Sequence, residues 1–267
     1  MSAQPEASMQ AGSVLVECTG AIATLTLNRP GQYNALSAEV LGALQSALDS
    51  IAADAAVRVV VIAGNGKAFC AGHDLKEMRA SPERKFHQEL FQQCGRMMQT
   101  IHNLPQPVIA QVNGIATAAG CQLVAACDLA VAAADARFAV SGINVGLFCS
   151  TPAVPLSRNM HRKQAMHMLL TGDFIDAETA LRLGLINEVV APERLASSTR
   201  ELAQKIAGKS PLSIRLGKKM FYQQLAMTLP EAYAFAAERM ACNMDSDDAR
   251  EGIDAFIQKR KPVWKGK

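Results

Sequence analysis

Aromatic residues are scarce in this sequence, and so is any excess of charge of one sign. Only 5% of the 267 residues are aromatic while 49% are apolar, so the core must be built from aliphatic side chains. The formal net charge of +3 is too small for a nucleic-acid-binding protein, which would carry a concentrated basic face. No apolar run reaches the roughly 20 residues that a membrane-spanning helix needs. We therefore expect a globular chain with no nucleic-acid partner and no membrane partner.

Paired cysteines and a targeting segment are missing as well. The seven cysteines contain no CxxC pair, a pattern that favours free thiols in a reducing compartment. We expect Cys18, Cys127 and Cys242 to be small core residues. The first twelve residues are polar and carry no Arg, unlike a signal or transit peptide. The sequence thus predicts a soluble cytoplasmic protein with no metal site and no cofactor of its own.

The chain alternates strands and helices before it becomes mostly helical. A cap at Ser37 predicts a helix over 38–53, and Ser81-Pro82-Glu83 predicts the start of another that runs to Ile101. Aliphatic runs predict strands over 14–17, 22–27, 57–63, 107–112, 128–133, 138–140 and 186–190. We predict an α/β fold, a spiral of ββα turns with a helical C-terminal region. Periodicity alone would equally allow a doubly wound sheet.

The same pattern divides the chain into three parts. They are a flexible tail (1–12), a spiral core domain that holds the ligand (13–200) and a helical C-terminal region (201–267). Positive side chains gather in the last part. They are Lys205, Lys209, Arg215, Lys218, Lys219, Lys259, Arg260, Lys261, Lys265 and Lys267. Solvated helix faces usually explain such a set, and a landing surface for a polyanionic ligand is the alternative.

Two clusters of small residues each follow an aliphatic strand. They are Ala71-Gly72 and Ala118-Ala119-Gly120. Small side chains let a backbone N–H group approach a ligand closely, and such donors stabilise negative charge on an oxygen when they are fixed in a dry site. The second cluster opens a predicted helix, whose N-terminus favours an anion. Ordinary tight turns are the alternative interpretation.

Four ordered segments give the chain a resemblance to a known family. They are Leu27-Asn28-Arg29-Pro30 with Asn34-Ala35-Leu36, the loop 69–75, the run 107–114 with 118–121, and 170–173 with Gly184-Leu185-Ile186. In this order and spacing they resemble the enoyl-CoA hydratase/isomerase (crotonase) family over nearly the whole chain. The loop 142–152 and the ending 258–264 look most like the subgroup called enoyl-CoA hydratase domain-containing protein 3.

The resemblance implies a ligand, a site and an assembly. The family binds an acyl-CoA thioester and polarises its carbonyl between two backbone amides, which here would be those of His73 and Ala119. It also implies a homotrimer or a dimer of trimers, assembled through the helical C-terminal region. The residues that would contact CoA are Arg29, Ala35, Ala71, His73, Asp74, Leu75 and Lys76, and the basic C-terminal residues are candidates to cover its 3′-phosphate.

The two acid/base residues of the family's hydratases are missing. Hydration needs one carboxylate that activates water and another that delivers a proton. The aligned positions are Gln122 and Gly142, and neither exchanges a proton near neutral pH. The family's isomerases keep a carboxylate at the second position or later in the same loop, where Ser150 stands. His87, Glu89 and Ser150 are the available substitutes, while we expect the His73 side chain to have a structural role.

Three functions stay open on these grounds. The first is an acyl-CoA enzyme of altered chemistry, such as a thioesterase, lyase or isomerase. The second is a non-catalytic acyl-CoA binder or partner subunit. The third is a standard hydratase of fatty-acid or acid catabolism, against which the missing carboxylates count.

Overall fold

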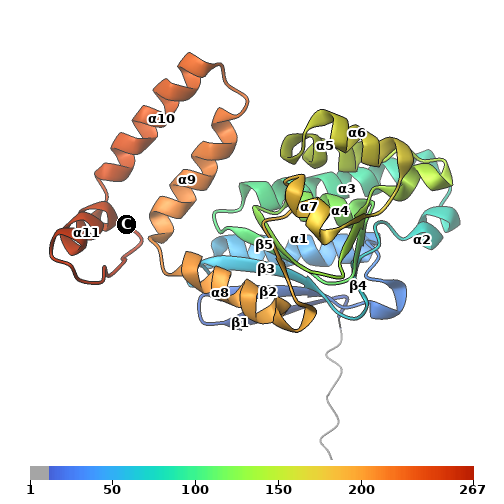
Figure 1. The fold of residues 1–267 in the computed structure, drawn as a ribbon, viewed down its shortest axis with the longest axis horizontal. Coiled ribbons are helices and arrows are strands. Elements are labelled where there is room, and N and C mark those ends of the chain that lie inside the picture. The colour runs from blue at the N-terminus through green and yellow to red at the C-terminus, as the bar shows by residue number, and fades with distance from the viewer. Residues whose placement is uncertain (1–11) are drawn as a thin grey trace, which may run out of the picture.

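The computed structural model describes residues 12–267 and consists of two sheets surrounded by helices (Figure 1). The predicted tail lies outside the described residues, except for Gly12. The larger sheet contains β1 (Val14–Thr19), β2 (Ile22–Leu27), β3 (Val59–Gly64), β5 (Val108–Val112), β7 (Leu129–Ala133) and β10 (Glu188–Val190), in this order. The smaller sheet contains β4 (Ala68–Cys70), β6 (Ile115–Thr117), β8 (Arg137–Ala139) and β9 (Ile175–Asp176).

Successive turns of the chain each give one strand to each sheet. β3, β5 and β7 are parallel neighbours in the larger sheet, and β4, β6 and β8, which follow them one by one, are parallel neighbours in the smaller sheet. Helix α3 (Arg84–Asn103) follows the first strand pair and α4 (Ala119–Ala126) follows the second. The predicted spiral of ββα turns is therefore confirmed, and the doubly wound sheet is excluded.

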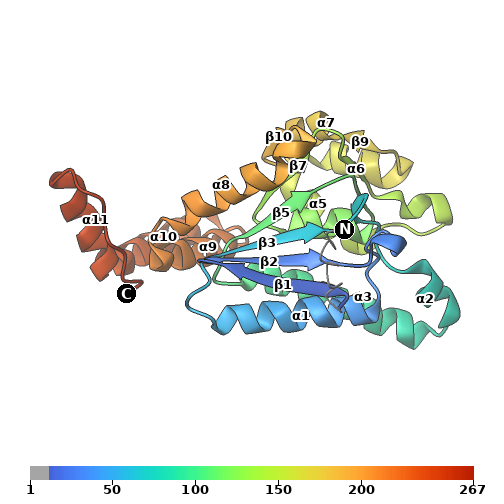
Figure 2. The same ribbon diagram turned by 90° about the horizontal axis from the view of Figure 1, so that it is seen from below.

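Helices cover both faces of the larger sheet (Figure 2). The remaining core helices are α1 (Ala38–Ala53), α2 (Leu75–Ala80), α5 (Ser150–Asn159), α6 (Arg162–Thr171), α7 (Ala177–Arg182) and α8 (Leu195–Ala207). Helices α1 and α8 lie on opposite faces of this sheet. Strand β3 is aliphatic throughout because both of its faces are buried. Val60 and Ile62 pack in the main core, whereas Val59 and Val61 pack against α8 on the other face.

Several local predictions are confirmed and others are wrong. Ser37 caps α1 by accepting a hydrogen bond from the amide of Val40 at 3.2 Å. The predicted loop 69–74 instead begins within β4 and is followed by α2, and the helix expected to start at Ser81 starts at Arg84. Cys127 is buried as predicted, but Cys18 and Cys242 are exposed. Their exposure follows from their elements, because β1 is an edge strand and Cys242 lies on a projecting helix.

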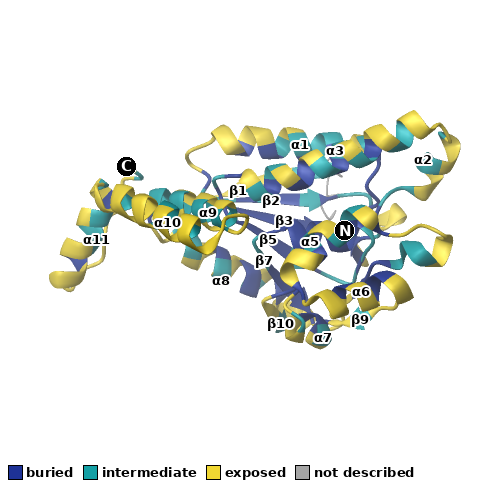
Figure 3. Ribbon diagram, turned by 90° about the horizontal axis from the view of Figure 1, so that it is seen from above, coloured by how far each residue is buried: buried dark blue, intermediate teal, exposed yellow. Residues whose placement is uncertain are grey.

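The C-terminal helices form an arm that projects away from the two sheets (Figures 1 and 2). The arm consists of α9 (Pro211–Gln224), α10 (Leu229–Met244) and α11 (Asp247–Ile257). Much of its ribbon is exposed (Figure 3). The large apolar side chains exposed on the arm and the segments next to its helices are Phe221, Leu225, Met227, Leu229, Tyr233, Met240, Met244, Ile253, Phe256, Ile257 and Val263. Within residues 12–267, no helix is long and apolar enough to cross a bilayer.

One buried polar cluster fastens the arm to the spiral. The Lys218 ammonium of α9 donates to the carboxylate of Asp128 at 2.7 Å and to the carbonyl oxygens of Ile101 and Gln106 at 3.0 Å each. The Tyr222 hydroxyl donates to the other Asp128 oxygen at 2.7 Å. Burial lowers the pKa of Lys218, although Asp128 opposes that shift. Lys218, one of the residues predicted to contact the CoA 3′-phosphate, is thus buried in contacts that stabilise the fold.

Candidate active site

The two small-residue clusters meet each other between consecutive turns of the spiral. Gly72 has a φ of +92°, a conformation that side chains rarely adopt, and a Cβ built on it would stand 3.2 Å from the amide nitrogen of Ala119 and 2.9 Å from the Cβ of Ala118. A Cβ on Gly120 would overlap the carbonyl group of Cys70. These glycines let the loop after β4 pack against the first turn of α4.

The amide of Ala119 is presented by a strained turn at the start of α4. Ala118, the residue before the helix, has φ 50° and ψ −119°, which costs about 1–3 kcal/mol for a residue other than Gly. Its own amide donates to the carbonyl oxygen of Ala139 at 3.0 Å. Ala119 is the first helical residue, so its N–H has no carbonyl partner inside the helix. The turn therefore offers a buried donor at the positive end of the helix dipole.

The amide of His73 is turned away from its backbone neighbour. Leu36 and His73 form an isolated parallel bridge, in which the Leu36 amide donates to Gly72 and the Asp74 amide donates to Leu36. In such a bridge the N–H of the central residue points to the opposite side. The His73 N–H group therefore makes no hydrogen bond to Leu36. His73 directly follows Gly72, the residue that packs against Ala119.

Gln122 is a buried amide on the first turn of α4. The residue is 3% exposed, and its Oε1 atom accepts no hydrogen bond from any residue in the described part of the chain. A buried amide oxygen without a donor is costly, about 1–3 kcal/mol. Such an atom would be satisfied by a hydrogen-bond donor on a bound ligand or water molecule.

Gly142 lies in the loop after β8, next to the turn that carries Ala119. The hydroxyls of Ser141 and Thr117 are 2.8 Å apart, which ties this loop to the end of β6. The Gly142 amide donates to the Cys149 sulfur at 3.3 Å. A Cβ on Gly142 would stand only 2.7 Å from that sulfur and from the Leu147 carbonyl oxygen. The thiol therefore occupies the space into which a side chain at position 142 would extend.

Each of the proposed substitute acids and bases is exposed or hydrogen-bonded to a backbone carbonyl oxygen. The His87 Nε2 atom is 3.0 Å from the Met78 carbonyl oxygen, and Glu89 is exposed beside Lys85 at 3.8 Å. Ser150 is also exposed and its hydroxyl donates to the Phe148 carbonyl oxygen at 3.4 Å. Sequence position alone could not reveal these engagements, because each depends on where the side chain turns.

The residues predicted to contact CoA are divided between internal and exposed positions. The Arg29 guanidinium donates to Ser37 at 3.0 Å and lies 3.8 Å from the Asp74 carboxylate, which in turn caps α2. Ala35 is buried, Ala71 is half-buried, and Leu75 and Lys76 are exposed at the start of α2. Apart from Lys205 on α8 and Lys209 just after it, the basic C-terminal residues lie on the arm or C-terminal to it, at the opposite end of the molecule from α2 (Figures 1 and 2). They cannot cover a ligand held at α2 of the same chain.

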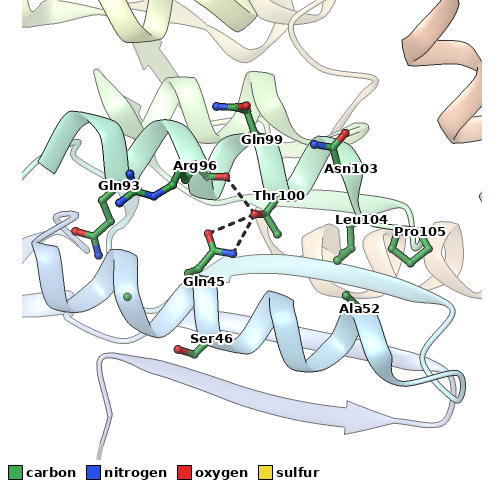
Figure 4. A pocket seen from close by; sticks show the side chains of 11 residues that line it. Gln45, Ser46, Ala52, Gln93, Arg96, Gln99, Thr100, Asn103, Leu104 and Pro105 are labelled. Atoms are coloured by element: carbon green, nitrogen blue, oxygen red, sulfur yellow. Dashed lines mark hydrogen bonds between the residues drawn. The ribbon is translucent and has the colours of Figure 1, made fainter. Parts of the chain in front are cut away.

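Two hollows on the surface lie elsewhere. A groove of about 710 Å³ runs between α1 and α3 (Figure 4), where Gln45 and Thr100 hydrogen-bond across it at 3.0 Å. A smaller hollow of about 360 Å³ lies beside Trp264 on the arm. Neither is lined by His73, Ala119, Gln122 or Gly142, and sequence reasoning did not predict either of them.

The fold and the paired glycine-supported turns define a crotonase-type protein. The sequence profile of the enoyl-CoA hydratase/isomerase family matches residues 17–267. The enoyl-CoA hydratase domain-containing protein 3 of Mus musculus is 48% identical over 91% of this chain and 81% of its own length. A crystal structure of an enoyl-CoA hydratase from Mycobacterium smegmatis has a TM-score of 0.94 and 54% identity, covering 95% of this chain and 99% of that one. The crystal structure of human enoyl-CoA hydratase domain-containing protein 3 has a TM-score of 0.93 and 45% identity, covering 95% of this chain and 100% of that one.

This chain therefore belongs to the enoyl-CoA hydratase/isomerase family, whose members bind acyl-CoA substrates, and its resemblance to the domain-containing protein 3 subgroup is confirmed. The prediction of a cytoplasmic location is contradicted. The mouse and human relatives are named mitochondrial proteins, which points to the mitochondrion rather than the cytoplasm. Free thiols and short apolar runs are common to proteins of both compartments, so composition could not distinguish them.

Proposed function

We propose that this protein binds an acyl-CoA thioester with the thioester oxygen between the amides of His73 and Ala119. The observation that carries the proposal is the close approach of Gly72 to the Ala119 nitrogen, which places the two donor segments side by side. Negative charge develops on that oxygen when the thioester reacts. A fixed donor in a dry site stabilises such charge by roughly 3–4 kcal/mol.

The protein is proposed to activate the thioester without the two-carboxylate hydration of the standard enzymes. Gln122 can orient a water molecule but cannot take its proton, and the thiol of Cys149 fills the space beside Gly142. Burial raises the pKa of Cys149, so it is a poor acid/base substitute. A non-catalytic acyl-CoA binder is the alternative, and the engaged or exposed positions of His87, Glu89 and Ser150 favour it over a thioesterase that uses those groups.

The division of the chain is proposed to follow these roles. The spiral over residues 13–200, with the end of α8, would bind the acyl-CoA with Lys76 and Leu75 open to the nucleotide, and the arm within residues 201–267 would mediate assembly. The exposed apolar side chains of the arm support a homotrimer or a dimer of trimers. A neighbouring subunit would then be the source of any basic C-terminal residue near the 3′-phosphate.

The proposal is tested by measuring butyryl-CoA binding beside crotonyl-CoA hydration. Calorimetric titration should show binding of butyryl-CoA, and the hydration assay should show little turnover. Ala119→Pro removes one donor, so a variant whose circular dichroism spectrum matches the wild type should have a weaker thioester complex but unchanged binding of CoA alone. Ala119→Ser keeps the donor and serves as the control. A wild-type protein that ignores butyryl-CoA would refute the proposal, and efficient hydration would replace it with a standard hydratase.

A further inference from the structure

Two side-chain atoms at the candidate site are buried without a hydrogen-bond partner in the described part of the chain. They are the Nε2 atom of His73 and the Oε1 atom of Gln122. A third such atom, Oε1 of Gln106, belongs to an amide whose nitrogen donates to the Ile51 carbonyl oxygen at 2.9 Å, so its place in the fold is clear. The Oε1 atom of Gln122 has no such structural explanation, whereas the His73 ring is anchored through its other nitrogen and leaves only Nε2 without a partner. His73 is itself a proposed thioester donor through its backbone amide, and Gln122 lies one helical turn after the other proposed donor, Ala119.

The hydrogen bond on the other side of the His73 ring decides which nitrogen carries the proton. The Nδ1 atom lies 3.2 Å from the Leu36 carbonyl oxygen. A carbonyl oxygen only accepts, so Nδ1 must donate. A neutral imidazole carries one N–H, which leaves a lone pair on Nε2. The ring is neutral because burial lowers its pKa below the ordinary value of 6.5, and the opposing contribution of Leu36 is smaller.

No residue from Gly12 to Lys267 donates a hydrogen bond to this lone pair. The imidazole lies edge-on to the Phe91 ring of α3, with ring centroids 5.4 Å apart. The neighbouring carboxylates are occupied: Asp74 caps α2 beside Arg29, and Glu77 accepts from the Ala38 amide at 3.1 Å. The buried thiols of Cys70 and Cys94 have pKa values raised to about 12, so they remain protonated and are not alternative bases. A desolvated base held in one tautomer by a backbone carbonyl is thus left without a partner among the described residues.

We propose that Nε2 of His73 is the proton acceptor for the α-carbon of the bound acyl-CoA, with the Gln122 amide as a neutral hydrogen-bonding partner. This inference rests on the proposed thioester site. In the forward step the C2–H bond breaks and an N–H bond forms at Nε2. The electron pair moves into a C1–C2 double bond, and negative charge moves onto the thioester oxygen between the amides of His73 and Ala119.

The proton then returns from Nε2 to carbon, which restores the neutral imidazole. Return to C2 exchanges the α-hydrogen, and return to C4 of a 3-enoyl chain gives the 2-enoyl isomer. Neither outcome needs a second acid/base group or a further reactant. Hydration does need two such groups. The site therefore supports single-base enolisation of acyl-CoA, the chemistry that remains when both carboxylates are absent.

The test is α-hydrogen exchange of butyryl-CoA in deuterated water, followed by proton NMR. Wild-type protein should catalyse the exchange. His73→Asn keeps the backbone amide, and its side-chain NH2 can still donate to Leu36, but it lacks the base. It should lose exchange by about 10²–10⁴-fold with unchanged butyryl-CoA affinity. The same substitution at exposed His167, on α6, is the matched control and should change neither quantity.

A pH profile separates the catalytic role from a packing role. The wild-type exchange rate should rise as pH increases through a value below 6.5 and then level off, because the neutral ring is the active form. The His73→Asn profile should lack that step. If wild-type protein binds butyryl-CoA but exchanges no deuterium, or if His73→Asn keeps the wild-type rate and profile, the inference is overturned while the binding site stands. A wild-type protein that binds no butyryl-CoA would instead refute the proposed function itself.

Discussion

The α-carbon of Gly72 lies so close to the amide nitrogen of Ala119 that a Cβ on residue 72 would stand 3.2 Å from it. These residues belong to different turns of the spiral, one after β4 and the other at the start of α4. Their contact brings together two segments whose amides are otherwise unrelated in the chain. The site thus depends on a glycine that forms no part of the chemistry.

Gly72→Ala should therefore weaken both the fold and the site. A side chain at φ +92° is strained, and here it would also press on Ala118. Gly20→Ala is the matched control, because Gly20 has φ +60° and open space around it. Both variants should lose about 1–2 kcal/mol of unfolding free energy from strain. Gly72→Ala should lose about 1–3 kcal/mol more from overpacking, together with butyryl-CoA binding. Equal losses in urea unfolding would show that the contact is unimportant.

Restoring the missing carboxylates is a second test, and its expected result depends on the packing around Gly142. Gly142 does not have a positive φ, so a glutamate there meets no backbone strain of that kind. Its Cβ would instead collide with the Cys149 sulfur and the Leu147 carbonyl oxygen. We expect Gln122→Glu with Gly142→Glu to raise crotonyl-CoA hydration only weakly. Adding Cys149→Ala should release part of the conflict and bring the gain toward about 10²–10⁴-fold.

Each single substitution should contribute much less than the combination, because water activation and proton delivery act together. Cys149→Ala alone should leave hydration at the wild-type level. A triple variant that folds and binds butyryl-CoA normally yet gains no hydration would show that this loop is shaped for different chemistry.

The cluster that fastens the arm predicts a large effect from one lysine. Lys218→Met leaves the carboxylate of Asp128 without its cation in a site where the Asp128 side chain is 14% exposed. Removing one partner of a buried ion pair costs roughly 3–5 kcal/mol. Lys219→Met, at an exposed neighbouring position, should change the unfolding free energy by less than about 0.5 kcal/mol. Equal stability of the two variants in urea unfolding would contradict the importance of the cluster.

Much of this architecture could be predicted because it depends on local patterns. The aliphatic run of β3 and the Ser37 cap have signals that lie within a few residues. The close approach of the two small-residue turns was predictable from their composition and from family resemblance, and their role as thioester donors stays a prediction. The tautomer of His73 was not, because it depends on a carbonyl group 37 residues away. The ion pair between Lys218 and Asp128 likewise joins residues 90 positions apart. The sequence therefore did not show that the Lys218 ammonium is paired inside the fold.

The arm predicts an oligomer that a surface substitution should disrupt. Phe256 is 85% exposed and Ile257 is 71% exposed, values that favour burial against another subunit. Light scattering of the wild-type protein should give the mass of a trimer or hexamer. Phe256→Asp with Ile257→Asp should reduce that mass, while Val16→Asp on the edge strand should not. A wild-type monomer at micromolar concentration would reject the proposed assembly.

The most direct test of the central claim is a crystal structure of the protein with bound butyryl-CoA. The quantities to measure are the two distances from the thioester oxygen to the backbone nitrogens of His73 and Ala119. Both should be about 3 Å, the range in which a backbone donor stabilises a developing oxyanion. A thioester oxygen beyond hydrogen-bonding distance of both nitrogens would contradict the account.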